Sequence, residues 1–174
     1  MQQLNQLLAR LIKAEVEFVL VGGLAAAIHG SSLTTRDVDV CCSFTATNLL
    51  RIQHAFDDQH PVHRMRPYLP IALTPEQCVH LKNLYIKTDL GVIDCLGSVL
   101  GVGDYGEVLK HSIEIELPIG KLRILDLDTM IQAKEAMGRP HDLLTVQHLK
   151  AVRQAEGGGS RHETLNRRVP NSAE

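Results

Sequence analysis

Two aspartates stand one residue apart in the segment Asp37-Val38-Asp39-Val40-Cys41, where polar and apolar residues alternate. Such alternation predicts a β-strand, in which residues i and i+2 face the same side. The two carboxylates would then project together, about 7 Å apart at their backbones given the rise of a strand. Adjacent carboxylates repel each other, and a divalent cation such as Mg²⁺ or Mn²⁺ would neutralise them. A strand face in contact with water is the alternative interpretation.

A third aspartate, Asp94, lies inside the apolar run 91–96. Burying an unpaired charge is costly, so Asp94 needs a partner. A cation shared with Asp37 and Asp39 would supply one, and we predict that these three acids are metal ligands and catalytic residues. The alternative is an edge strand on which Asp94 faces water.

Gly22 and Gly23 come between a predicted buried strand over 17–21 and an alanine-rich helix over 24–28. Glycine lets the backbone approach a ligand closely, and the free N–H groups at the start of a helix attract phosphate. An ordinary tight turn is the alternative. The spacing matches neither a Walker loop nor a dinucleotide fingerprint.

Lys134 falls on the apolar stripe of a helix predicted over 127–137. A lysine on the inward face indicates an anionic partner at the edge of the core, and a snorkelling side chain is the alternative. A second helix is predicted from Pro140 to about residue 155. Asp142 suits the first turn of that helix because of the helix dipole. Arg139 would contact either a ligand or Asp142.

The other patterns predict a helix over 4–12 and a helix over 47–60 that is capped by Thr47 or Asn48. They also predict strand pairs over 81–87 and 91–96, and over 113–117 and 122–125, the second pair turning at Gly120-Lys121. Four of the seven prolines fall within 61–78, which is predicted to be a loop with little regular structure. Residues 1–156 are predicted to form one domain, and residues 157–174 a disordered tail.

The chain of 174 residues is 44% hydrophobic and 22% charged, which is typical of a soluble globular protein. Its formal net charge of -2 argues against a large basic surface for nucleic acid. No apolar run reaches the roughly 20 residues that a membrane span needs, and the N-terminus has no secretory signal. We therefore expect a cytoplasmic protein with no membrane partner, and buried, reduced cysteines.

The motifs also have a characteristic order. The Gly22-Gly23 pair is followed after 13 residues by Asp37-Val38-Asp39, and later by Ile93-Asp94-Cys95. This order resembles the polymerase-beta-type nucleotidyltransferase superfamily. The bacterial minimal and AbiEii-like branch is similar over roughly residues 15–155, through motifs at 21–25, His29-Gly30, Thr35, 91–94, 134–136 and 139–142.

The resemblance implies an α+β (mixed α/β) nucleotidyltransferase fold, with a central mixed β-sheet flanked by helices. It implies transfer of a nucleoside monophosphate from an NTP to an acceptor hydroxyl, with Mg²⁺ or Mn²⁺ as cofactor. Lys134 would assist catalysis, and the implied nucleotide-binding residues are Gly22, Gly23, Thr35, Lys134 and Arg139. An RNA such as tRNA, a protein or a small molecule is the expected acceptor. The toxin of a toxin–antitoxin pair, with an antitoxin as partner, is one form that this function takes.

Two positions depart from the pattern of that branch. Leu33 stands where an arginine usually precedes the threonine by two residues, and His141 replaces a lysine. These departures support a second hypothesis, a catalytically inactive module of the same fold that binds nucleotide or a partner protein.

Overall fold

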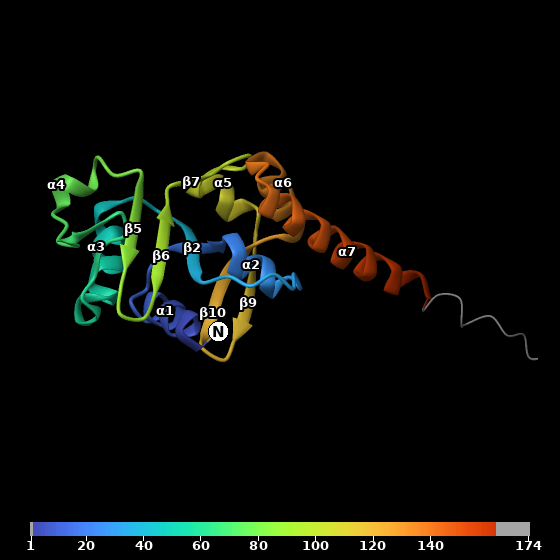
Figure 1. Cartoon of the computed structure of the whole chain (residues 1–174), viewed down its shortest axis with the longest axis horizontal. Helices are drawn as coiled ribbons and strands as arrows, with labels where there is room; N and C mark the ends of the chain where they lie inside the picture. The colour runs from blue at the N-terminus through green and yellow to red at the C-terminus, as the bar shows by residue number, and fades with distance from the viewer. Residues whose placement is uncertain (1, 163–174) are drawn as a thin grey trace, which may run out of the picture.

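A mixed eight-stranded β-sheet with helices packed against it forms the centre of the protein (Figure 1). The computed structural model describes the backbone of residues 2–162 and the side chains of residues 2–155. The strands follow one another across the sheet in the order β4-β3-β5-β6-β2-β1-β10-β9, and β7 and β8 form a separate pair. The predicted architecture, a central mixed sheet flanked by helices, is confirmed.

The strands are β1 (Phe18–Val21), β2 (Asp37–Cys42), β3 (Val62–His63), β4 (Arg66–Pro70), β5 (Asn83–Lys87), β6 (Val92–Leu96), β7 (Ser98–Val99), β8 (Gly103–Asp104), β9 (Ser112–Leu117) and β10 (Gly120–Leu125). The helices are α1 (Gln2–Lys13), α2 (Gly22–Ile28), α3 (Ala46–Ala55), α4 (Pro75–Cys78), α5 (Tyr105–Lys110), α6 (Leu127–Met137) and α7 (Pro140–His162), with a 3₁₀ turn over Asp57–Gln59. The predicted helices over 4–12 and 127–137 and the predicted strand pairs correspond to α1, α6, β5–β6 and β9–β10.

The middle of the sheet positions the acidic residues. Strand β2 lies between β1, to which it is antiparallel, and β6, to which it is parallel. Side chains alternate along a strand, so Val38 and Val40 face the side opposite to Asp37 and Asp39. Both valines are completely buried. Burying that face holds β2 in register, because a shift of one residue would turn the aspartates into the core.

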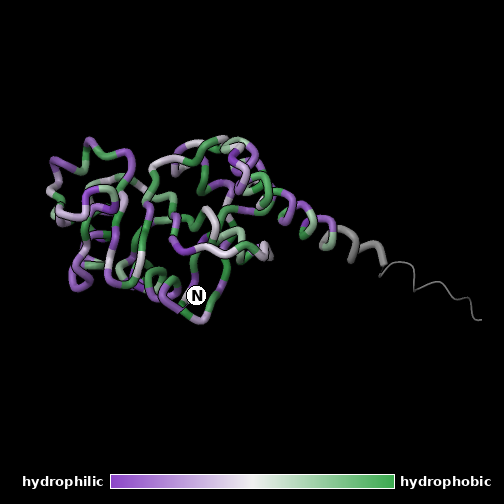
Figure 2. The backbone as a smooth tube through the Cα atoms, viewed as in Figure 1, coloured by the Kyte–Doolittle hydropathy of each residue, from purple (hydrophilic) through white to green (hydrophobic). Residues whose placement is uncertain are grey.

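Helix α1 closes part of the core with three completely buried leucines, Leu7, Leu8 and Leu11. Their spacing places them on one face, and the helix contacts α3, β2 and β10. All four cysteines are free and buried, as predicted. Figure 2 shows hydrophobic residues along the central strands and hydrophilic residues recurring along α7.

The predicted cap of the helix after β2 was wrong. Thr45 caps α3, because its side chain accepts a hydrogen bond from the backbone N–H of Asn48. Asn48 is inside the helix and buried, and its amide bonds the backbone of Glu17 and Ser43. Asn48 therefore ties α3 to the residues that flank β1 and β2, instead of capping the helix.

The prediction of a loop over 61–78 was also wrong. This segment forms β3, β4 and α4, and Thr74 starts α4 with a capping box. Strand β4 is an edge strand, where a residue without a backbone N–H is tolerated, so Pro67 and Pro70 do not prevent pairing. The ladder of β3 with β5 is a long-range contact that local composition does not reveal.

Two further boundaries differ from the prediction. Gly120 pairs with Leu117, so the β9–β10 turn lies at Pro118-Ile119 and not at Gly120-Lys121. Helix α7 continues to His162 and projects from the body at the end opposite α4 (Figure 1). The predicted tail over 157–174 thus starts within α7, and residues 163–174 lie outside the described part of the chain. None of the helices described is long and apolar enough to cross a membrane.

Candidate functional site

Asp37, Asp39 and Asp94 come together on one face of the sheet. Strands β2 and β6 are parallel neighbours, and Asp39 lies directly opposite Asp94 in their register. Asp37 precedes Asp39 by two residues and so shares its face. Because β6 lies between β5 and β2, the edge-strand alternative for Asp94 was wrong. The Asp94 side chain is only 16% exposed.

Arg64, a residue that the sequence did not single out, bridges two of these acids. Its guanidinium donates to Asp94 Oδ2 over 2.6 Å and lies 3.0 Å from Asp37 Oδ2. The backbone N–H of Arg64 donates to the carbonyl oxygen of Tyr85 on β5, which holds the β3–β4 turn beside the acids. The hydrogen bond with Asp94 raises the pKa of Arg64, as do the negative charges of Asp94 and Asp37. The arginine thus supplies the positive charge next to these two carboxylates.

The chemistry of this donor set suits a hard divalent cation, although the present arrangement does not form a complete coordination site. Among the described residues, no three His, Cys, Asp or Glu side chains are grouped so as to hold a metal ion. Asp37 and Asp94 instead direct one oxygen each to Arg64. Asp94 Oδ1 is buried and has no hydrogen-bond partner among those residues, which is unfavourable for a carboxylate oxygen. Three carboxylates, of which Asp94 has an unpaired buried oxygen, are the hard oxygen ligands that Mg²⁺ or Mn²⁺ prefers. The metal site itself is a prediction.

The surroundings of Asp39 perturb its carboxyl group. Its pKa is raised to about 6, mainly by burial and also by the negative charges of Asp94 and Asp37. The positive charge of Lys134 and a hydrogen bond from the backbone N–H of Gly23 act in the opposite direction. A carboxyl group with a raised pKa is a common feature of functional sites, because burial and like charges are normally avoided elsewhere.

Gly22 and Gly23 begin α2 next to the acids. Gly22 has φ +68°, and a Cβ at this position would lie 2.1 Å from Asp39 Oδ2. Only glycine therefore allows the backbone to pass this carboxylate. A Cβ on Gly23 would lie 2.8 Å from Thr35 Oγ1, whose hydroxyl donates to the carbonyl oxygen of Asp37. The sequence predicted that the glycine backbone approaches a ligand closely. In the structure, the groups that this backbone approaches are the side chains of Asp39 and Thr35.

Lys134 is buried, and its anionic partner is Asp142 on α7 at 3.0 Å. Arg139 donates to the other carboxylate oxygen of Asp142. Burial of Asp142 raises its pKa, but the hydrogen bonds from Arg139 and Lys134 outweigh it, so the pKa is lowered overall. The predicted inward-facing lysine is confirmed, and Arg139 contacts Asp142 as one of the two expected alternatives.

A cavity of about 350 Å³ joins this ion-pair cluster to Asp39. Its polar and charged lining residues are Asp39, Asn83, Ser98, Lys134 and Arg139. Gly22 also borders the cavity, together with the mostly apolar side chains of Val21, Leu96, Val99, Leu100, Leu125, Met130, Ala133 and Met137. Gly23 and Thr35 do not line it. The cavity therefore combines apolar walls with one half-buried acid and two cations at its border.

Known proteins offer little beyond this geometry. No protein-family model matches the sequence, and no curated protein matches it. One similar solved structure is that of a "putative nucleotidyltransferase" from Thermotoga maritima, with 17% identity and a TM-score of 0.49. The similarity covers 91% of this chain and 88% of the other.

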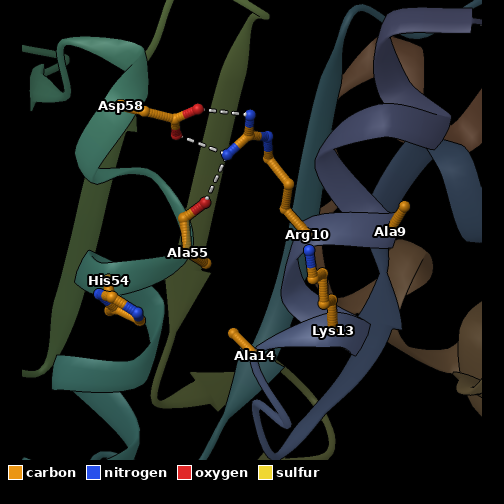
Figure 3. Close-up of a pocket in the computed structure, with 7 residues that line it drawn as sticks. All are labelled: Ala9, Arg10, Lys13, Ala14, His54, Ala55 and Asp58. Carbon is orange, nitrogen blue, oxygen red and sulfur yellow. Dashed lines mark hydrogen bonds and ion pairs between the residues drawn. The ribbon is translucent and has the colours of Figure 1, made fainter.

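A second and larger cavity, of about 480 Å³, lies between α1 and α3 (Figure 3). Arg10 crosses one side of it and donates to both carboxylate oxygens of Asp58 and to the carbonyl oxygen of Ala55. None of the predicted site residues lines this cavity. Arg10 and Asp58 already pair with each other there, so the candidate site is the smaller cavity beside Asp39.

The sequence contained one indirect signal for Arg64. Asp94 lies within an apolar strand and required a cationic partner, which we predicted to be a metal. Arg64 is 30 residues away along the chain, in the segment expected to be a loop. The sequence therefore indicated that Asp94 needs a positive charge nearby. It did not indicate that Arg64 supplies this charge.

Proposed function

We propose that this protein transfers a nucleoside monophosphate from an NTP to an acceptor hydroxyl, with Mg²⁺ or Mn²⁺ held by Asp37, Asp39 and Asp94. The observation that carries the proposal is the register of β2 and β6, which sets Asp39 opposite Asp94 and beside Gly22. A structural protein would gain nothing from three carboxylates on neighbouring interior strands, since like charges repel. A phosphate-transferring site needs such a cluster.

In the proposed reaction, the acceptor oxygen attacks the α-phosphorus, a new P–O bond forms, and pyrophosphate leaves. A bound divalent ion would stabilise the charge on the phosphate oxygens and favour deprotonation of the hydroxyl. The carboxylates of Asp37, Asp39 and Asp94 would hold the ion. Lys134 and Arg139 would offset negative charge at the border of the cavity, where electrostatic stabilisation contributes most to this chemistry.

The nucleotide would lie in the cavity beside Asp39. Its apolar walls suit a planar base, and its acid and cations lie at the polar end. Gly22 borders the same space, and the Asp39 carboxylate lies where a side chain of residue 22 would be, so a metal ion on Asp39 would meet the triphosphate beside this backbone. Gly23 and Thr35 would hold this backbone in position, since Thr35 packs on Gly23 and its hydroxyl donates to the carbonyl oxygen of Asp37.

Incubation with each α-labelled NTP, Mg²⁺ or Mn²⁺, and cell RNA and protein tests the proposal. Label should move to an acceptor, and Asp39→Asn should reduce the rate by about 100-fold or more, because the carboxylate charge is lost while the shape is kept. Asp89→Asn is the matched control, since Asp89 is exposed and pairs with His60 outside the site. With the metal ion below saturation, the rate should rise with pH through about 6, because the proton on Asp39 competes with the metal ion for the carboxylate. No labelling with any NTP or either metal would contradict the proposal.

A second candidate function is a module that binds nucleotide or protein without turnover. Its supporting observation is Arg64, which already neutralises part of the charge on Asp37 and Asp94. Leu33 and His141, where the resembled branch has arginine and lysine, point the same way. Calorimetry measures nucleotide binding, and product analysis after prolonged incubation with metal measures turnover. A module would bind nucleotide and leave it unchanged.

The class of acceptor follows from the same labelling experiment. Label in RNA, in protein or in a small molecule identifies one of the three expected classes. If RNA or protein is labelled, growth arrest on expression, relieved by Asp39→Asn, is the outcome expected of a toxin. Relief by a neighbouring gene would then identify the antitoxin partner.

A further inference from the structure

We propose that Arg64 is an internal cation that competes with the divalent metal for Asp37 and Asp94, so that metal binding displaces its side chain. The inference rests on the proposed metal site and adds a residue that controls access to it. Arg64 would keep the carboxylates neutralised until a metal ion takes its place.

The contacts of Arg64 are those of an incomplete substitute for a metal ion. It reaches one oxygen of Asp94 and one of Asp37, and does not form a two-oxygen fork with either carboxylate. Paired forks are the geometry in which arginine binds a carboxylate most strongly. Asp94 Oδ1 is left buried without a partner among the described residues. One guanidinium charge thus faces two carboxylates, and a divalent ion would match their charge better.

The position of Arg64 makes it the part that moves. It lies in the turn between β3 and β4, two strands at the edge of the sheet, and the β3–β4 pairing is irregular at Val62-His63. Its side chain is 35% exposed, so water can hydrate the guanidinium once a metal ion has taken its place. Asp37 and Asp94 lie on interior strands whose ladders hold them in place.

Calorimetric titration with Mn²⁺ alone, without nucleotide, tests the inference on Arg64→Gln and the unchanged protein. Removing the competing charge should tighten Mn²⁺ binding by about tenfold or more. The net charge of the site becomes more negative, and Mn²⁺ no longer has to displace a guanidinium. Arg66→Gln removes the same charge from the same hairpin. Arg66 is exposed and has no ion pair among the described residues, so its loss should leave the affinity within about twofold.

Hydrogen exchange of residues 62–70 gives a second readout that does not depend on activity. Saturating Mn²⁺ should speed exchange in this hairpin of the unchanged protein, because the link from Arg64 to β2 and β6 is lost. The Arg64→Gln protein should already show the faster exchange and should change little with Mn²⁺. Arg64→Lys keeps a charge with shorter reach, and should give an intermediate affinity even if Arg64→Gln folds poorly.

The outcomes separate the inference from the proposed function. Equal or weaker Mn²⁺ binding by both Arg64 variants would overturn the role of Arg64 and leave the metal site standing. Absence of Mn²⁺ binding by every protein, with folding verified by circular dichroism, would remove the metal site and the inference together. Tighter binding by Arg64→Gln but not by Arg66→Gln supports both.

Discussion

Gly22 and Asp39 show how one missing side chain shapes the site. The Asp39 carboxylate occupies the space that a Cβ on Gly22 would take, and Gly22 also has a positive φ. Two separate costs would therefore follow from any substitution, a backbone cost of about 1–2 kcal/mol and the steric displacement of Asp39. The structure contains a glycine at which only the first cost applies.

We predict that Gly22→Ala is more destabilising than Gly138→Ala by about 1–3 kcal/mol. Gly138 has a similar φ of +65°, but a Cβ there would meet nothing closer than 3.7 Å. Urea unfolding of the two variants at neutral pH, with chelator present, measures the difference. Equal losses would show that Asp39 moves aside freely and that the close approach has no structural cost.

At the scale of elements, α6 and α7 are joined by three ion pairs, of which one is buried and two are exposed. Lys134 and Asp142 have side chains that are 9% and 0% exposed, whereas Glu135 and Lys150 are both roughly half exposed. Removing one partner of a buried pair leaves an uncompensated charge in the core. An exposed pair contributes little, because water replaces each partner.

The expected cost of Asp142→Asn is about 3 kcal/mol of unfolding free energy, since Lys134 stays buried and loses its counter-charge. Glu135→Gln removes a carboxylate that links the same two helices and should cost at most about 1 kcal/mol. Guanidinium titrations followed by circular dichroism provide both values. The assignment of Lys134 and Asp142 as the pair that locks α6 to α7 fails if the two variants are equally stable.

At the scale of the whole molecule, α7 belongs to the domain only over its first part. Asp142, Val146 and Leu149 are buried, and Leu149 is the last core residue among the side chains described. Residues 153–155 are exposed. Helix α7 as a whole projects from the body (Figure 1). The domain boundary at residue 156 predicted from the sequence therefore falls after the last residue of the core.

A chain that ends at residue 156 should unfold within about 2 °C of the full chain, because no described core contact is removed. A chain that ends at residue 139 loses the four buried residues of α7, which are Asp142, Thr145, Val146 and Leu149, and leaves Lys134 without Asp142. Its unfolding temperature should fall by roughly 10 °C or more. Differential scanning calorimetry compares the three chains, and a large loss on removal of residues 157–174 alone would show that the end of the chain supports the fold.

The sequence by itself determined the features that depend on neighbours a few residues away. Alternation predicted β2 and its two aspartates, and helical spacing predicted α1 and α6 with Lys134 turned inward. These patterns are reliable because the side-chain periods of strands and helices are local properties of the backbone. The three acids and the glycine pair can therefore be recognised from the order of residues alone.

Tertiary structure alone decided which charges meet. Arg64 reaches Asp94 across 30 residues, and Lys134 on α6 donates to Asp142 on α7. Strand β3 forms through its ladder with β5, although the prolines around it favour a loop. Such contacts depend on the order of strands in the sheet and the packing of α6 on α7. Neither is encoded in a local period, because each is set by burial summed over the whole chain.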